Sequence, residues 1–322
     1  MRRFFFRRLL QSILLIFIII FINFIILRIT PGDPVGIAKA QGDRLNSSQA
    51  KPDQAGVQKQ LKIYTDPLPI AFFNWTLNAL TLDFGTSLQT KLPVTPDVVR
   101  AAINSFWLLA GGLLLGMLGI PLGIYAALHR GRVIDSFLQF ITLLFTALPG
   151  WFLALLIGFA YTQLVYVPTY LKTGEAFSLP QWYSFLPTFF IAVIFLSRFF
   201  IYSRSQTLEV LQEDYVRTAR AKGLPNRTVL LRHIFRNSLS PLISILGGLI
   251  PFIFSAQILI EHSAGGGGLG GLFLRAASNR DYTTLMAIFT VLAVACVLCS
   301  LLADIAYALS DPRVSNQAIS KI

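Results

Sequence analysis

The chain has 322 residues, of which 54% are hydrophobic and only 13% are charged, and its mean hydropathy is +0.64. Soluble globular domains carry about a quarter charged residues, so this composition indicates a membrane protein. The net charge of +12 is compatible with nucleic-acid binding, but in a membrane chain the placement of Lys and Arg is more informative than their sum.

Six apolar stretches have the length of a membrane span: about 9–27, 106–128, 137–161, 182–202, 239–260 and 285–309. A helix needs about 20 residues to cross ~30 Å of hydrocarbon. The first stretch is longer than the apolar core of a signal peptide, and no small-x-small cleavage motif precedes TPGDP, so we predict a retained span. The sequence therefore predicts an all-α polytopic membrane protein with six transmembrane helices.

Charge placement predicts the orientation. Lys and Arg gather at the N-terminus, in the connection after the second span, in segment 203–240 and at the C-terminus, whereas the two short connections on the other side hold only Lys172, Arg275 and Arg280. Cytoplasmic connections are richer in positive residues, so both termini are predicted to be cytoplasmic. The expected parts are then 1–29 (N-terminal segment and first span), 30–105 (extracytoplasmic segment) and 106–322 (transmembrane core with a long cytoplasmic loop at 203–240).

The extracytoplasmic segment changes character along its length. Its first part is polar and poor in aromatic residues, which is typical of loop or weak helix. Its second part, 67–88, has aromatic residues and leucines at roughly helical spacing. We expect this part to pack on the outer membrane face or on a partner; the alternative is a connector that only covers the spans.

Small residues and prolines mark the spans. Gly112, Gly116, Gly119 and Gly123 form two small-xxx-small pairs, which predict close helix packing or, alternatively, a pore-lining face. Kinks are expected at four prolines, because each removes a backbone hydrogen bond: Pro149, Pro187, Pro241 and Pro251.

Several apparent catalytic motifs carry little weight. Cys296 and Cys299 form a CxxC inside an apolar span without a second pair, so they are interpreted as small buried hydrophobes. The run GGGGLGG at 265–271 follows a span and no strand, so it is interpreted as a flexible outer turn. The sequence has no GxxxxGK[ST] motif and its three histidines are scattered, so we expect no enzyme activity, no metal site and no bound cofactor in this chain.

Two ionisable residues lie in or beside spans and are candidate functional residues for that reason: Arg198 and Asp304. Both fall toward the cytoplasmic ends of their spans, where snorkelling or capping satisfies a charge. We favour this structural interpretation over an ion-coupling role.

The loop 203–240 contains EDYVRTARAKGLPNRTVLLRH, which predicts a short helix, a stop and a second helix. Glu213 and Asp214 suit a helix N-terminus, and Glu213 has the favourable spacing to pair with Arg217. Gly223 suits a left-handed C-terminal cap before Pro225.

One face of the predicted short helix has almost no bulk, with Val216, Ala219 and Gly223 along it. We predict that this face fits a groove in a partner. Asn226 is expected to cap a second helix that begins at Arg227. Retention of basic residues by membrane topology explains the arginines but not the small face.

The runs DYVRTARAKGL, LLRH and RNSLSPLI closely resemble the cytoplasmic loop of dipeptide, oligopeptide and nickel permeases of ATP-binding-cassette importers. Further runs are similar to the same family along nearly the whole chain: RRLLQSILL, LRITPGDPV, DFGTSLQTKLPV, GIPLGIYAAL, LEVLQEDY and LADIAYALSDPR. TPGDP and AKGL resemble the first of the two permeases in such systems. The chain departs from the general EAA-triplet pattern at Arg217 and Thr218, and from its relatives at GGGGLGG.

The resemblance implies a type I importer permease fold with an insertion after the first helix. It also implies a coupling helix that docks on an ATPase subunit, made of Glu213, Asp214, Tyr215, Val216, Arg217, Thr218, Ala219, Arg220, Ala221, Lys222, Gly223 and Leu224. The implied partners are a second permease, two ATPases that bind and hydrolyse ATP, and an extracytoplasmic substrate-binding protein, all at the inner membrane.

The cargo implied by the family is a peptide, nickel or another small solute. Two other classes remain as alternatives at this point. An ATP-independent secondary transporter or channel would use Arg198 and Asp304, and a membrane-tethered nucleic-acid binder would use the basic loop.

Overall fold

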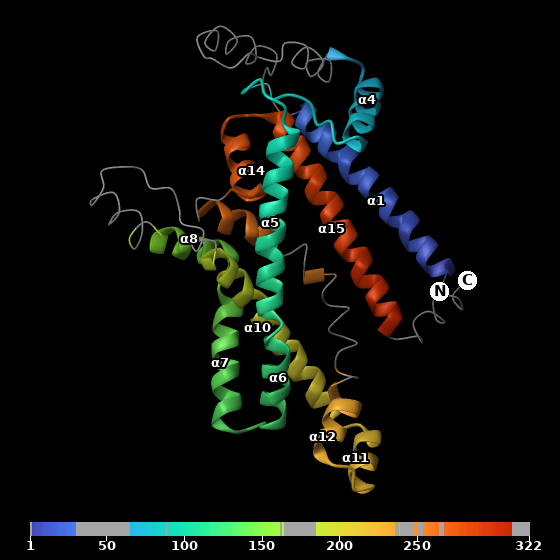
Figure 1. Cartoon of the computed structure of the whole chain (residues 1–322), viewed down its shortest axis with the longest axis vertical. Coiled ribbons are helices and arrows are strands. Elements are labelled where there is room, and N and C mark those ends of the chain that lie inside the picture. Colours follow the sequence, from blue (N-terminus) through green and yellow to red (C-terminus); the bar gives the residue numbers. More distant parts are fainter. Residues whose placement is uncertain are drawn as a thin grey trace. The chain divides into compact units, whose positions relative to one another are not determined.

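The computed structural model describes residues 2–29, 65–87, 89–161, 163, 185–235, 238, 248–249, 254–263 and 267–310. This part of the chain is helical, and its only β-type pairing is an isolated antiparallel bridge between Thr86 and Pro93. The helices of the N-terminal half are α1 (Arg2–Ile29), α4 (Leu68–Leu80), α5 (Thr95–Gly116), α6 (Gly119–Leu128), α7 (Val133–Ala147) and α8 (Gly150–Tyr161) (Figure 1). Those of the C-terminal half are α10 (Phe185–Val210), α11 (Asp214–Ala221), α12 (Asn226–Thr228), the π-helix η3 (Val229–Phe235), α14 (Leu269–Ser278) and α15 (Tyr282–Ser310). The predicted all-α fold is confirmed.

Four stretches of helix in the described residues are long and apolar enough to cross a membrane: Phe5–Ile26, Thr95–Leu128, Pro187–Val210 and Tyr282–Ala306. The third predicted span is divided into α7 and α8, because the chain becomes extended at Leu148 before Pro149. Most of the fifth predicted span, 239–260, lies outside the described residues. The count of six spans therefore stays a prediction.

Two helices extend beyond the predicted spans. Residues 95–105, which the sequence assigns to the extracytoplasmic segment, form the first turns of α5. The fourth predicted span ends at 202, and α10 continues to Val210. In these last turns of α10, Ser203 is fully buried, and its hydroxyl can donate to the main-chain oxygen of Ile120 or of Phe200, each at 3.2 Å. The boundaries of the expected parts stay predictions.

The chain divides into two compact units that are interleaved along the sequence. Unit 1 contains Met1–Arg8, Phe106–Ala264 and Cys299–Ile322, and unit 2 contains Leu9–Ser105 and Gly265–Leu298. We describe each by itself.

Unit 1 is built around the packing of α6 against α10. The four glycines of the predicted small-residue face, two at the end of α5 and two in α6, all face α10. A Cβ atom added at Gly112 would lie 2.4 Å from Ile191 Cγ2, and one added at Gly116 would lie 2.3 Å from Phe195 Cβ. At Gly119 it would lie 2.3 Å from the Leu196 oxygen, and at Gly123 it would lie 2.0 Å from Ser203 Oγ. The prediction of close helix packing is confirmed. The adjoining core contains Ile120, Ile124, Ile191, Phe195 and Phe199.

The segment predicted to be extracytoplasmic contributes α4 to unit 2. Ala71, Phe72 and Trp75 are buried on one face of α4, where Phe72 makes edge-to-face contacts with Phe21 and Phe24 of α1. The helical prediction for this stretch is confirmed, and its buried face covers the chain's own helices. Its other face exposes Ile70, Phe73, Leu77 and Leu80.

Candidate functional site

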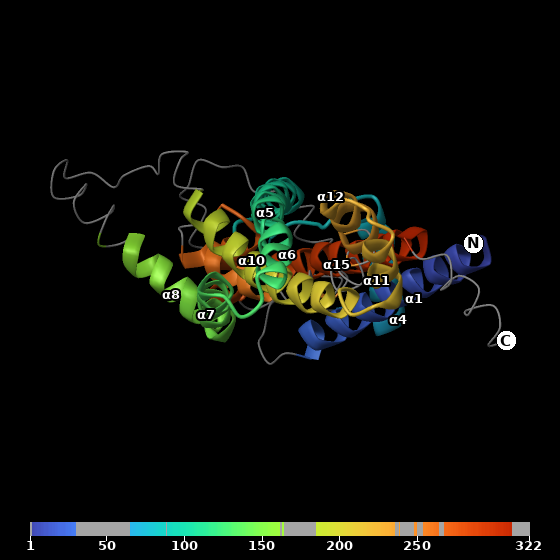
Figure 2. The ribbon, with the colours of Figure 1, turned by 90° about the horizontal axis from the view of Figure 1, so that it is seen from below.

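The short helix predicted in the cytoplasmic loop is present as α11, directly after α10 (Figure 2). Its first turn begins after Glu213, whose extended backbone (φ −68°, ψ 142°) places its carbonyl to accept hydrogen bonds from the Val216 and Arg217 amides at 3.1 and 3.3 Å. Glu213 lies outside the helix, so the expected Glu213–Arg217 pair does not form. Arg217 instead lies 3.7 Å from Asp214, with both side chains highly exposed, which contributes little stability.

The predicted C-terminal cap is confirmed. Gly223 has φ +74°, its amide donates to the Arg220 oxygen at 2.9 Å, and the Leu224 amide donates to the Ala219 oxygen at 3.3 Å. These two bonds define a Schellman motif, in which a left-handed residue ends the helix and satisfies its last carbonyls. The cap fixes the length of α11 at two turns.

The small face of α11 does not point toward a partner, contrary to our prediction. Val216 is 0% and Ala219 is 5% exposed, and both pack against Val210, Val229 and Ile234 of the same chain. These five residues form the mount of α11. This part of the small face therefore packs against the end of α10 and against η3, whereas Gly223, the third residue of the predicted face, is exposed.

The exposed side of α11 is opposite to the mount. At 100° per residue, the positions farthest from Val216 and Ala219 are Asp214, Arg217, Thr218 and Ala221. All four are exposed, and we call them the outer ridge. The ridge is short, polar and ends in a small residue, with Tyr215 and Arg220 on its flanks.

The second predicted helix of the loop begins one residue early, at Asn226. The Pro225 oxygen accepts the first hydrogen bonds, from Thr228 at 2.9 Å and Val229 at 3.1 Å. The main chain of Pro225 thus occupies the position before the helix; the side chain of Asn226 lies outside what the structure describes, so its predicted capping role stays a prediction. The helix then widens into η3, which supplies Val229 and Ile234 to the mount.

The part of α10 nearest to α11 is fixed by a buried ion pair that the sequence did not reveal. Arg204 Nε lies 2.8 Å from Asp135 Oδ1 and Arg204 Nη2 lies 2.9 Å from Asp135 Oδ2. Asp135 also accepts hydrogen bonds from the Gly131 amide at 3.1 Å and Gln139 Nε2 at 3.0 Å. This bidentate pair joins α7 to α10 six residues before α10 ends at Val210. The signal in the sequence was a lone Asp at the start of an apolar helix.

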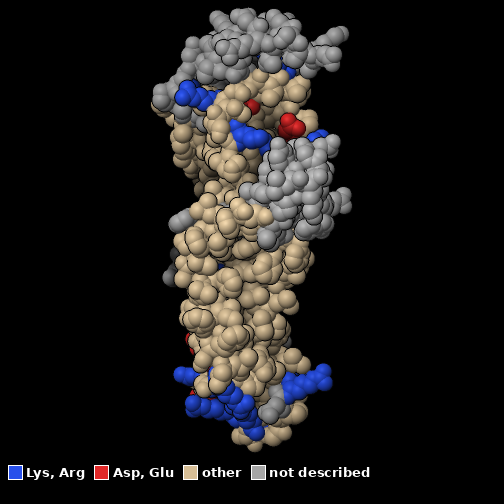
Figure 3. All heavy atoms as spheres, turned by 90° about the vertical axis from the view of Figure 1, so that its left-hand side faces the viewer, with Lys and Arg blue, Asp and Glu red and all other residues tan. Residues whose placement is uncertain are grey.

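Figure 3 shows Lys and Arg side chains gathered at the end of unit 1 that carries the α6–α7 turn and α11, next to a surface almost free of charge. The exposed members of this group are Arg130, Arg132, Arg217, Arg220, Lys222, Arg227 and Arg232. These seven residues are among those that predicted the orientation, and they lie at one end of unit 1.

The two intramembrane candidates have separate surroundings. Asp304 Oδ2 lies 3.4 Å from Arg8 Nη1, and the two side chains are 37% and 45% exposed. This pair is consistent with the structural interpretation of Asp304. Arg198 is half-buried in α10.

The glycine-rich run at 265–271 and the two cysteines, Cys296 and Cys299, lie in or beside helices. In the described part of GGGGLGG, residues 269–271 form the first turn of α14, so the predicted outer turn is wrong there. Ser105 Oγ accepts a hydrogen bond from the Leu269 amide at 2.8 Å, which fixes the start of α14. Cys296 and Cys299 are free thiols in α15, and no cluster of three metal-ligating side chains occurs among the described residues.

Long apolar helices and a basic end make this chain a multi-pass membrane protein. Residues 119–316 match the family model described as "Binding-protein-dependent transport system inner membrane component". The match covers more than half of the chain, which therefore belongs to this family.

Relatives that match nearly the whole chain support the same family assignment. The chain is 33% identical over 317 residues to the oligopeptide transport system permease protein AppB of Bacillus subtilis, covering 96% of this chain and 98% of the relative. It is 31% identical over 321 residues to the metal-staphylopine import system permease protein CntB of Staphylococcus aureus, covering 99% and 100%. It is 28% identical over 308 residues to the dipeptide transport system permease protein DppB of Bacillus subtilis, covering 93% of each. The chain is a permease subunit of an ATP-binding-cassette importer, as the resemblance predicted.

Proposed function

We propose that this permease couples ATP hydrolysis in separate subunits to solute import through α11. The observation that carries the proposal is the two-sided construction of α11: its outer ridge is exposed, whereas its small face is buried in the mount. A surface helix held in this way can accept a partner without losing its own position. Residues 213–224 are assigned to this contact as a unit, with the outer ridge touching the ATPase.

The packing in unit 1 indicates how a movement of the ATPases is transmitted to the spans. A displacement of α11 acts on Val210 of α10 and Ile234 of η3, because Val216 and Ala219 pack against both residues. The Asp135–Arg204 pair and the glycine contacts connect α10 to α7 and α6. Since α6 and α10 touch backbone to backbone, they move together as ATP binding closes the ATPase dimer.

The complete assembly that we propose has a second permease, two ATPases and an extracytoplasmic substrate-binding protein. In the topology that we propose, with six spans and both termini in the cytoplasm, α11 lies on the side of the ATPases, and the charge distribution supports this orientation. The cargo proposed for this chain is a short peptide or a related small solute, with a metal such as nickel as the alternative. Catalysis of ATP hydrolysis is assigned to the ATPases and no cofactor to this chain.

Substitution on the two faces of α11 tests the proposal. In the assembled transporter, Ala221→Trp adds bulk to the outer ridge and is expected to reduce co-purification of the ATPases and ATP-dependent uptake, while the permease still inserts and folds. Arg130→Trp is the matched control, because Arg130 is exposed in the α6–α7 turn and outside the ridge. Wild-type uptake by Ala221→Trp would refute the docking surface, and uptake that survives ATP depletion would refute coupling altogether.

A further inference from the structure

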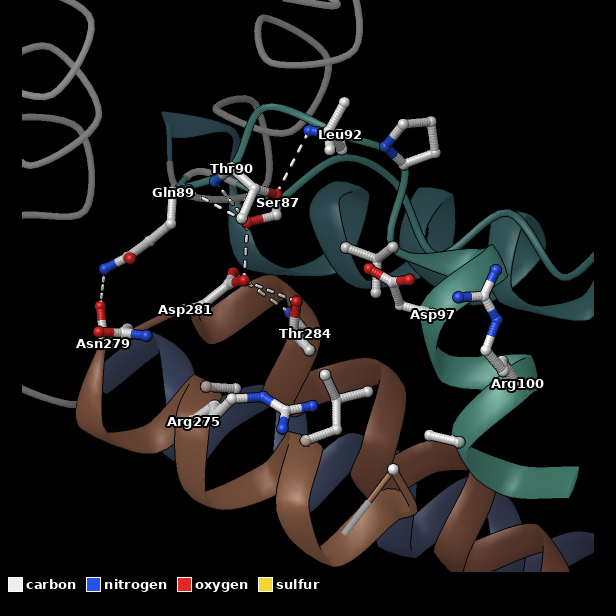
Figure 4. A pocket seen from close by; sticks show the side chains of 16 residues that line it. Ser87, Gln89, Thr90, Leu92, Asp97, Arg100, Arg275, Asn279, Asp281 and Thr284 are labelled. Carbon is white, nitrogen blue, oxygen red and sulfur yellow. Dashed lines mark hydrogen bonds between the residues drawn. The ribbon is translucent and has the colours of Figure 1, made fainter. Parts of the chain in front are cut away.

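Unit 2 contains a cavity of about 400 Å³ that no part of the proposed coupling uses. Residues of the loop 87–94, the first turns of α5, α14 and the start of α15 line it (Figure 4). Small-molecule sites have volumes of about 300–1,000 Å³, so the cavity is large enough for a small solute.

The floor of the cavity is fixed by hydrogen bonds. Asp281 is buried and accepts hydrogen bonds from Ser87 Oγ at 2.7 Å and Thr284 Oγ1 at 2.6 Å. Ser87 Oγ in turn accepts the amides of Gln89 and Thr90, both at 3.1 Å. Gln89 Nε2 also donates to the oxygen of Asn279, at the end of α14. The loop is thereby held against α14 and α15, which is the preorganisation that a binding site needs.

Three exposed charged side chains complete the lining. Asp97 and Arg100 project from α5 and Arg275 from α14 (Figure 4). Within the described ranges, the guanidinium groups of Arg100 and Arg275 have no carboxylate within ion-pair distance. The carboxylate of Asp97 likewise has no Lys or Arg side chain within that distance. Asp281 also lines the cavity; its carboxylate accepts hydrogen bonds from the Ser87 and Thr284 hydroxyls and, among the described residues, forms no ion pair.

We propose that this cavity binds a small zwitterionic solute, with the carboxylate of the solute on Arg100 and Arg275 and its ammonium group on Asp97. Guanidinium groups match carboxylates in shape and charge and bind them bidentately. A cavity for a simple anion needs no exposed carboxylate, so Asp97 favours a ligand that carries both charges. The inference rests on the proposed import function, since it assigns a solute site to the segment placed outside the membrane.

Dialanine is a suitable probe, because it carries one carboxylate and one ammonium group. Saturation-transfer NMR with the full chain in lipid nanodiscs measures its Kd, together with those of dialanine amide and N-acetyldialanine. We expect dialanine to bind and both blocked peptides to bind about tenfold more weakly, since each loses a charged hydrogen-bond partner.

Three variants assign the contacts. Arg275→Ala and Arg100→Ala should each weaken dialanine about tenfold and leave dialanine amide unchanged, whereas Asp97→Asn should weaken dialanine and leave N-acetyldialanine unchanged. Arg280→Asn is the matched control: Arg280 is exposed outside the lining, and Asn tolerates its positive φ of 57°. Substitutions at exposed positions seldom affect folding.

Absence of dialanine binding, equal binding of dialanine and its amide, or equal weakening by Arg280→Asn would overturn the proposal. These outcomes are separate from those of the coupling test. Binding to the isolated chain requires no ATPase, so a failure of Ala221→Trp to affect transport would refute docking by α11 and leave the cavity site standing.

Discussion

The contact between α6 and α10 provides a quantitative test of how this permease is held together. Replacing Gly123 by Ala adds one Cβ atom, which would lie 2.0 Å from Ser203 Oγ, 2.5 Å from the Phe200 oxygen and 3.0 Å from the Arg204 amide. The Ser203 hydroxyl can rotate, but the Phe200 oxygen belongs to the backbone of α10 and falls about 0.9 Å short of the 3.4 Å of ordinary contact. The two helices must therefore separate.

Overpacking of this kind costs about 1–3 kcal/mol, whereas Gly to Ala in an unstrained helix stabilises by up to ~1 kcal/mol. We expect Gly123→Ala to lower the Tm of the detergent-solubilised chain, measured by differential scanning fluorimetry, and to reduce uptake because α10 supports α11. Gly158→Ala is the control, since its added Cβ would lie 3.5 Å from Ser263 Cβ, its nearest neighbour among the described residues, and Gly158 also lies in an apolar helix. A Tm for Gly123→Ala equal to or above that of Gly158→Ala would refute the close approach of α6 and α10.

Three further predictions concern the coupling site and the ion pairs. Gly223→Val should reduce uptake several-fold at matched expression because it destabilises the left-handed cap by about 1–2 kcal/mol, whereas Gly223→Asn should retain most uptake; equal uptake by the two variants would contradict the role of the cap. Asp135→Asn should destabilise the chain by about 3 kcal/mol in thermal unfolding because it leaves Arg204 without its buried carboxylate, and the double variant Asp135→Leu/Arg204→Met should recover much of the loss; no loss in the single variant would contradict the pair. Asp304→Asn should change stability by less than about 1 kcal/mol, because the Arg8 pair is exposed, and should leave uptake near wild type; abolished uptake with intact assembly would return Asp304 to an ion-coupling role.

The coupling helix illustrates how far local reasoning from the sequence extends. The start at Asp214, the cap at Gly223 and the stop before Pro225 were all predictable, because capping depends on residues within one turn of the helix end. The face that the helix buries was not. A face of Val216, Ala219 and Gly223 looks the same in sequence whether it meets a partner or its own chain, and only the positions of Val210, Val229 and Ile234 decide between them.

The sequence by itself determined the features that depend on composition and spacing: the membrane class, the all-α fold, the glycine face that runs along α5 and α6, and the existence of α11. The tertiary structure decided the features that join distant residues, such as the Asp135–Arg204 pair across 69 positions and the Ser87–Asp281 bond across 194. The physical reason is that apolar periodicity and caps act over a few residues along the chain, whereas burial of a charge requires a partner that only folding brings near.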